Sequence, residues 1–385
     1  MAYVGDAEQQ IIGDDTPAST VAEARPSPRL EGLVVAIAQG FFEVSASNQT
    51  YLCTLRGRLR STRSPRAESL QRTQTFKRGR SAPVASQYRQ ATNGKREGAL
   101  ATTETEDSPV RIAPGDNVLF TPLGMGQGII EEVLPRRSVL SRARSEAGGE
   151  HVMLANLDHA VLVFAVQDPT PHFGMLDRYL SLCEHAHTDV TICLNKVDLG
   201  IPEDVQRAIE NYRALGYYVL TTSAAQTSGI DILRERLTGR TSLLTGPSGV
   251  GKSSLINVLL PEARQRTAAI SEATGKGRHT TTGARLLPLP GGGWLADSAG
   301  IRELALWNVA SDELPGTFIE LRPFVDQCEY EDCDHSPNAE GCALRQALTD
   351  GHITPERFAG FERLLAEALD TEQAEYSQHG RTIRR

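Results

Sequence analysis

The apolar residues in the first part of the chain fall into short runs separated by turn signals. Three β-rich runs occur within residues 30–55, divided at Gly40 and at Ser47-Asn48, and two more occur within residues 118–133. Short apolar runs bounded by Gly, Ser and Asn are typical of β-strands. Five or so such strands in a unit of this size predict a small β-barrel of the OB type, and a generic β-sandwich fragment fits the same pattern.

From His159 onward, short apolar runs alternate with helical stretches. We expect strands at residues 160–166, 190–194, 217–221, 242–245 and 294–296, and helices at 175–186, 202–215, 229–237 and 252–260. This alternation predicts βαβ units on a parallel sheet. The last segment contains a Cys/His cluster followed by helical stretches with apolar positions at Phe358, Phe361, Leu364, Leu365 and Leu369.

These patterns predict a multidomain protein. The expected parts are a flexible leader at residues 1–29, a barrel at 30–148 with a basic insertion at 56–109, an α/β domain at 150–308 and a zinc-binding, helical domain at 309–385. A length of 385 residues suits two or three domains. Hydrophobic content of 39% with 23% charged residues excludes wholesale disorder. The acidic, polar start and the lack of a long apolar run predict a cytoplasmic protein without a membrane span.

The charge is distributed unevenly. The chain has a net charge of −8, yet the twelve Lys or Arg and two acidic residues of segment 56–97 give that segment +10 and leave −18 for the rest. OB barrels bind single-stranded nucleic acid through basic grooves and aromatic side chains, so this concentration favours RNA binding over an ordinary solvated charge run. The candidate residues are the arginines Arg56, Arg58, Arg60, Arg136, Arg137, Arg142 and Arg144, with Arg381, Arg384 and Arg385 at the C-terminus. The aromatic candidates are Phe41, Phe42 and Tyr51, for which a place in the barrel core is the alternative.

A phosphate-binding loop is the most specific motif of the chain. It reads Gly246-Pro247-Ser248-Gly249-Val250-Gly251-Lys252-Ser253, with Ser254 following. An apolar strand precedes it and a helix follows it, which is the context that separates a true loop of this kind from a chance match. The glycines let backbone N–H groups surround phosphates, Lys252 is expected to reach the β and γ phosphates, and Ser253 is expected to hold Mg²⁺.

A second motif indicates the base. Asn195-Lys196-Val197-Asp198 ends a predicted strand, so its polar groups lie at the edge where α/β sheets bind ligands. The Asp198 carboxylate can accept from N1–H and the exocyclic amine of guanine, Asn195 is expected to meet the other polar edge of the base, and the Lys196 stem is expected to cover the ring. Ser223 and Ala224 follow another strand, where a backbone N–H can meet guanine O6; an ordinary turn is the alternative.

Two further segments complete a nucleotide site. Asp297-Ser298-Ala299-Gly300 directly follows a strand, so Asp297 is expected to hold Mg²⁺ through water and Gly300 to sense the γ-phosphate. Between this motif and the phosphate loop lies the polar segment 277–282, where one of Thr280, Thr281 and Thr282 is expected to ligate Mg²⁺; a plain loop is the alternative.

Cys328, Cys333, His335 and Cys342 supply four soft or borderline donors within fifteen residues. Thiolates and an imidazole suit one tetrahedral, structural Zn²⁺. A redox pair is the competing interpretation, and a reducing cytosol with a well-placed histidine argues against it.

The order of these motifs is unusual, because the base motif precedes the phosphate loop, whereas ordinary GTPases have the reverse order. The permuted order, the Gly277-Arg278-His279-Thr280-Thr281-Thr282 run, the preceding barrel and the following Cys/His cluster resemble the RsgA/YjeQ family of circularly permuted GTPases over residues 30–370. Ala299 stands where similar proteins usually have proline.

The resemblance implies a GTPase that binds GTP with Mg²⁺, contains zinc, and acts in late maturation of the small ribosomal subunit through its rRNA. Ile301 stands where many GTPases have a water-positioning glutamine, so His279 is the nearest candidate for that catalytic role together with Lys252; contact with RNA or solvent is the alternative for His279. We expect slow turnover that the ribosomal partner accelerates, a monomer, and a C-terminal region that γ-phosphate loss repositions. A P-loop ATPase or kinase and a non-enzymatic, zinc-containing RNA-binding module are the competing functions.

Overall fold

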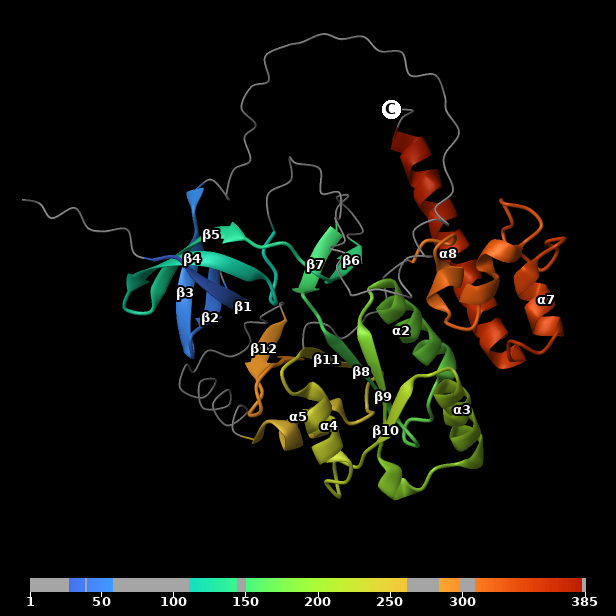
Figure 1. Cartoon of the computed structure of the whole chain (residues 1–385), viewed down its shortest axis with the longest axis horizontal. Coiled ribbons are helices and arrows are strands. Elements are labelled where there is room, and N and C mark those ends of the chain that lie inside the picture. The colour runs from blue at the N-terminus through green and yellow to red at the C-terminus, as the bar shows by residue number, and fades with distance from the viewer. Residues whose placement is uncertain are drawn as a thin grey trace, which may run out of the picture.

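The computed structural model describes residues 28–38, 40–57, 111–143, 150–261, 284–297 and 309–382 (Figure 1). Most of the predicted leader 1–29 and of the basic insertion 56–109 lies outside these residues, as does segment 277–282. Figure 1 shows a barrel on one side of a sheet and the C-terminal helices on the other. Of the helices described, none combines the length and the apolar character that a bilayer crossing needs.

The N-terminal domain is a closed barrel of five strands in the order β1-β2-β3-β5-β4. Its strands are β1 (Leu30–Ala38), β2 (Phe41–Ala46), β3 (Gln49–Leu55), β4 (Asn117–Gly124) and β5 (Gln127–Val133). Pairing of β1 with β4 closes the barrel, and β3 runs parallel to β5. The inward side chains of alternate positions form its core, with Val34, Val44, Phe120 and Ile130 fully buried. The predicted OB-type barrel is confirmed.

A two-stranded hairpin that the sequence did not predict connects the barrel to the rest of the chain. It consists of β6 (Val139–Ala143) and β7 (Glu150–Ala155). Gly115, at φ +92°, lets the barrel approach the end of this hairpin, because a Cβ there would lie 2.0 Å from the Ala155 carbonyl oxygen. The Asn156 amide donates to the Gly115 carbonyl at 2.8 Å, so barrel and hairpin are joined by a buried hydrogen bond.

The central domain is a six-stranded sheet in the order β10-β9-β8-β11-β13-β12. Its elements are β8 (His159–Ala165), α2 (Phe173–His185), β9 (Asp189–Asn195), α3 (Glu203–Ala214), β10 (Tyr218–Thr221), α4 (Ile230–Leu237), β11 (Thr241–Thr245), α5 (Lys252–Leu259), β12 (Arg285–Pro288) and β13 (Trp294–Asp297). All pairs are parallel except β12 with β13. The predicted βαβ pattern is confirmed, and the antiparallel edge strand β12 is an addition to it.

Both faces of this sheet are buried, as expected for parallel strands with crossover helices. Alternate β8 side chains point to opposite faces of the sheet. Leu162 and Phe164 are buried in one core together with side chains of α2 and α3, and Val161 and Val163 are buried in a second core together with side chains of α4 and α5.

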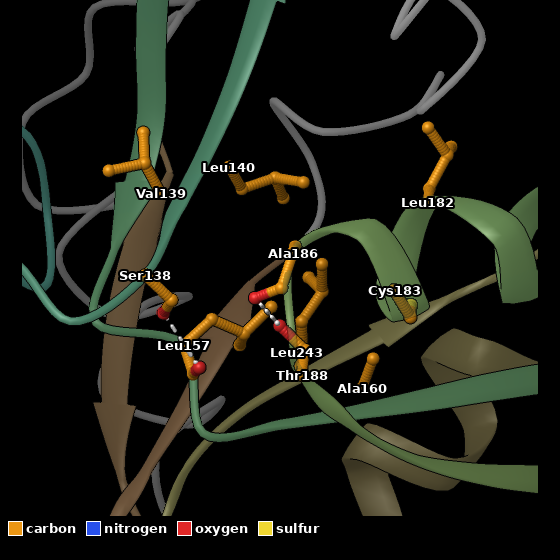
Figure 2. Close-up of a pocket in the computed structure, with 10 residues that line it drawn as sticks. All are labelled: Ser138, Val139, Leu140, Leu157, Ala160, Leu182, Cys183, Ala186, Thr188 and Leu243. Carbon is orange, nitrogen blue, oxygen red and sulfur yellow. Dashed lines mark hydrogen bonds between the residues drawn. The ribbon is translucent and has the colours of Figure 1, made fainter. Parts of the chain in front are cut away.

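A small apolar cavity of about 20 Å³ lies where the hairpin meets the sheet (Figure 2). Leu140 of β6, Cys183 of α2 and Leu243 of β11 line it, and Ser138 donates to the Leu157 carbonyl at 2.9 Å beside it. This volume holds about one water molecule. The cavity lies toward the amino ends of the strands, away from the edge where α/β sheets bind ligands.

The C-terminal domain is helical, as predicted. Two 3₁₀ turns, Leu314–Thr317 and Arg322–Gln327, precede α7 (Ala343–Thr349) and the long α8 (Pro355–Thr382). Phe318, Phe358 and Phe361 are buried in the same core as the α2 side chains. The domain therefore packs directly against the α2 face of the central sheet.

Candidate nucleotide-binding site and metal cluster

The predicted nucleotide motifs follow the carboxyl ends of neighbouring strands. The base motif begins at Asn195, the last residue of β9, the phosphate loop follows β11, and Ser223 follows β10. Asp297 ends β13, which pairs in parallel with β11, so its backbone reaches the same edge. Loops at this edge of a parallel sheet form the usual ligand crevice.

The phosphate loop needs its glycines for two separate reasons. Gly246 and Gly251 have φ values of +142° and +95°, which side chains rarely allow. A Cβ at Gly246 would lie 2.1 Å from the Val163 carbonyl oxygen, and one at Gly251 would lie 2.3 Å from Asn195 Nδ2. The loop is thus packed against β8 and against the base motif.

Lys252 is the first residue of α5, and its side chain folds back over the loop. Its Nζ donates to the carbonyl oxygens of Gly246 at 2.7 Å and Pro247 at 2.5 Å. Ser253 and Ser254 follow in the first turn of α5 and are exposed. A helix N-terminus with a lysine beside it is a favourable place for phosphate.

Asn195 joins three loops of the site. Its side chain is buried, its Nδ2 donates to the Val250 carbonyl at 2.9 Å, and its Oδ1 accepts from the Ala224 N–H at 3.2 Å. The Thr222 hydroxyl donates to the same Oδ1 at 3.2 Å. The predicted contacts of Asn195 and of the Ala224 N–H with the base stay predictions, and the structure gives both groups the task of holding the loops together.

Asp198 is oriented by Ser223, whose hydroxyl donates to Asp198 Oδ1 at 2.5 Å. Lys196, two residues before Asp198, has φ +64°, and its Nζ donates to the Asp168 carbonyl oxygen. The structure therefore brings Asn195, Lys196, Asp198, Ser223 and Ala224 together beside the phosphate loop. The Thr222 hydroxyl and the Asp168 carbonyl were missed, since a backbone oxygen and a strand-end threonine leave no signal in the sequence.

His279, Thr280, Thr281, Thr282 and Gly300 lie outside the described residues, as does the Asp297 side chain.

The predicted RNA-binding side chains that the structure describes are mostly engaged within the chain. Arg56 pairs with Glu131 at 2.9 Å, Arg137 with Asp158 at 3.0 Å, and the largely buried Arg136 with Asp116 at 2.7 Å. Among the aromatic candidates, Phe42 is buried, Tyr51 packs on the Phe120 ring, and Phe41 is 44% exposed. The side chains of Arg58, Arg60, Arg142, Arg144, Arg381, Arg384 and Arg385 lie outside the described part.

The Cys/His cluster forms a compact donor group before α7. The Sγ atoms of Cys328, Cys333 and Cys342 lie 3.7, 3.6 and 3.6 Å from His335 Nδ1. All four donor atoms lie within 4.8 Å of one another. Tetrahedral Zn²⁺ with ordinary Zn–S and Zn–N bonds separates sulfur from nitrogen by about 3.5 Å, so the donors fit that metal.

The other three cysteines behave differently. Burial raises the thiol pKa of Cys53 to about 11 and those of Cys183 and Cys193 to about 12. These thiols stay protonated at neutral pH and pack as apolar side chains.

Comparison with known proteins shows which family has this sequence and fold. The RsgA GTPase family model matches residues 133–307. The small ribosomal subunit biogenesis GTPase RsgA of Ectopseudomonas mendocina is 46% identical over 259 residues, covering 66% of this chain and 74% of the relative. The protein of that name from Gemmatimonas aurantiaca is 43% identical over 242 residues, covering 62% of this chain and 78% of the relative.

Solved structures agree with the sequence relatives. YjeQ from Thermotoga maritima superposes with a TM-score of 0.64 at 27% identity, covering 89% of this chain and 99% of that one. YloQ, a circularly permuted GTPase, has the same fold with a TM-score of 0.62 at 24% identity, covering 90% of this chain and 99% of that one. The chain belongs to the RsgA GTPase family.

Proposed function

We propose that this protein hydrolyses GTP to GDP and phosphate while bound to the small ribosomal subunit, and that it acts in late maturation of that subunit through rRNA. The hydrogen bond from Asn195 to the Val250 carbonyl carries the proposal, because it joins the base motif to a phosphate loop that comes more than fifty residues later in the chain. The names of the relatives, small ribosomal subunit biogenesis GTPases, support the reaction and the partner.

The residues have distinct tasks in this reaction. Asp198 accepts from the guanine N1–H and amine, the Lys196 stem covers the ring, and the N–H groups of residues 248–251 surround the phosphates. Lys252 exchanges its contacts with the Gly246 and Pro247 carbonyls for the β and γ phosphates. Ser253 and Asp297 would hold Mg²⁺, which neutralises phosphate charge when bound.

His279 is the proposed water-positioning residue, and Gly300 the proposed γ-phosphate sensor. His279→Ala is expected to slow single-turnover GTP hydrolysis in the presence of small subunits by about a hundredfold, as for other positioned general bases. An unchanged rate would remove His279 from catalysis and leave contact with RNA as its role.

The guanine assignment is tested with Asp198→Asn. We expect the wild-type chain to hydrolyse GTP in strong preference to ATP, and faster with purified small subunits, and the variant to lose the guanine preference because an amide cannot accept from both guanine donors. Asp231→Asn is the matched control, since Asp231 is an exposed α4 residue whose carboxylate pairs with Arg234 three positions on. Equal hydrolysis of GTP and ATP by wild type would favour the ATPase alternative, and no hydrolysis at all would favour the RNA-binding module.

The Cys/His cluster is proposed to hold one structural Zn²⁺. Segment 328–342 forms no regular helix or strand in the structure, so metal bonds would supply its folding free energy. Elemental analysis of the purified chain should give one zinc per molecule, and Cys333→Ser should lose it. A chain that folds fully and contains a disulfide between these cysteines instead would favour the redox alternative.

A further inference from the structure

The loop between β8 and α2 crosses the nucleotide site, although its residues belong to none of the motifs described above. It begins at the end of β8, where the Val166 N–H donates to the Asn195 carbonyl at 3.0 Å. The next side chain, Gln167, reaches the turn that carries Asp198. Its Nε2 donates to the carbonyl oxygens of Leu199 at 3.1 Å and Gly200 at 3.0 Å.

The loop then contacts the two other parts of the site. The Asp168 carbonyl accepts from Lys196 Nζ. Pro169 lies beside the phosphate loop, since a Cβ built on Gly249 would be 3.6 Å from its Cδ. One short loop therefore contacts the turn that contains Asp198 and the lysine of the base motif, and it lies beside the phosphate loop.

The turn that contains Asp198 is also held at the end of β10, because the Val197 N–H donates to the Thr222 carbonyl at 3.2 Å. It is a single 3₁₀ turn, Val197–Leu199, closed by hydrogen bonds from the Leu199 and Gly200 N–H groups to the Lys196 and Val197 carbonyls, each 3.0 Å long. The Ser223 hydroxyl holds one carboxylate oxygen of Asp198. The Gln167 amide nitrogen donates to two carbonyls at the end of this turn, so Gln167 holds the turn through contacts separate from those of Ser223 and Thr222.

We propose that Gln167 is a positioning residue for guanine recognition: it holds the Leu199 and Gly200 carbonyls so that the Asp198 carboxylate stands ready to accept from N1–H and the exocyclic amine of guanine. This inference rests on the proposed function. Gln167 acts through its contacts with the turn.

Comparison of GDP with inosine diphosphate isolates this effect, because inosine diphosphate lacks the exocyclic amine that only a correctly placed Asp198 can use. Binding of both to the full-length chain is measured by titration calorimetry with wild type, Gln167→Ala and Gln206→Ala. Gln206 is the matched control: it is a half-buried glutamine on α3 whose amide donates to Glu210 one turn away. Loss of two net hydrogen bonds is expected to weaken GDP binding by Gln167→Ala about five- to thirty-fold and to lower its preference for GDP over inosine diphosphate, with Gln206→Ala unchanged.

A double-mutant cycle with Asp198→Ala tests whether Gln167 acts through that carboxylate. If it does, adding Gln167→Ala to Asp198→Ala changes GDP affinity less than about twofold. Equal weakening of both nucleotides by Gln167→Ala, or additive effects in the cycle, would show a merely structural role and overturn the inference. A wild-type chain without preference for guanine nucleotides would overturn the proposed function and this inference together, whereas wild-type preference that Gln167→Ala leaves intact overturns only the role of Gln167.

Discussion

At the scale of single residues, His159 shows how burial alone fixes a protonation state. The first residue of β8 is fully buried, with Nε2 2.9 Å from the Thr191 hydroxyl and with no hydrogen-bond partner for Nδ1 among the described residues. Burial, and then the charges of Arg240 and Arg236, lower its pKa to about 4, against a smaller opposing effect of Asp189. The folded protein therefore keeps this imidazole neutral where the unfolded chain, with a pKa near 6.5, takes up a proton.

The consequence is a loss of stability in acid. Because the unfolded state binds more protons between about pH 6.5 and pH 4, the free energy of unfolding should fall through that window, by about 2 kcal/mol between pH 7 and pH 5 from His159 alone. Urea unfolding at the two pH values measures it. His159→Gln should remove that part of the pH dependence, and His187→Asn, at an exposed position with φ +50°, should leave it. Equal pH dependence in wild type and His159→Gln would contradict the assignment.

At the scale of elements, the contact between α2 and α8 depends on a buried ion cluster. Arg357 of α8 is 5% exposed, donates from Nε to Glu320 at 2.5 Å and pairs with Asp177 of α2, which also accepts from the Tyr212 hydroxyl at 2.6 Å. Burial raises the pKa of Asp177, and Arg357 acts against that shift. A Cβ at Gly360 would lie 2.4 Å from Asp177, so glycine lets the helices approach closely.

Removal of the shared cation should therefore be costly. Arg357→Ala leaves two buried carboxylates without a counter-charge, and we expect a loss of about 3–5 kcal/mol in the free energy of unfolding. Arg178→Ala is the matched control, because Arg178 joins the same two helices through an exposed pair with Glu367 and should cost at most about 1 kcal/mol. Chemical unfolding compares the two, and equal losses would show that burial of the cluster does not matter.

The same scale shows what the sequence could and could not predict. Strands such as β8 and helices such as α3 follow from apolar runs and helical periodicity, and the predicted boundaries differ from the structure by one or two residues. The hairpin β6–β7 and the edge strand Arg285–Pro288 were missed, because such short strands take their structure from pairing partners and not from a local pattern. Glycines and strand-end motifs located the site. The hydrogen bonds from Gln167 to Leu199 and Gly200 could not be predicted, because they join a side chain to backbone carbonyls more than thirty residues away.

At the scale of the whole molecule, the barrel contacts β12, which is the neighbour of the strand that ends at Asp297 in the nucleotide site. Glu43 of β2 pairs with Arg285 of β12 at 2.6 Å, and β1 also contacts β12. β12 in turn pairs with β13, with Arg285 opposite Asp297. A barrel displaced by RNA would therefore act on the strand that ends at a proposed Mg²⁺ residue, so the proposed RNA-binding and GTP-hydrolysing parts are mechanically connected.

Loss of the Glu43–Arg285 pair should affect the stimulation of GTP hydrolysis by small subunits more than the free energy of unfolding. The pair is partly exposed, so it contributes at most about 1 kcal/mol, and a coupling of that size changes a rate by about two- to fivefold. We expect Glu43→Gln to lower GTP hydrolysis stimulated by small subunits by that factor and to leave hydrolysis without subunits unchanged. Glu31→Gln makes the same charge change at an exposed β1 position outside the pair and should retain full stimulation. Stimulation that survives Glu43→Gln and Arg285→Gln alike would mean that the barrel only tethers the protein to its partner, and that the signal for hydrolysis reaches the site by another path.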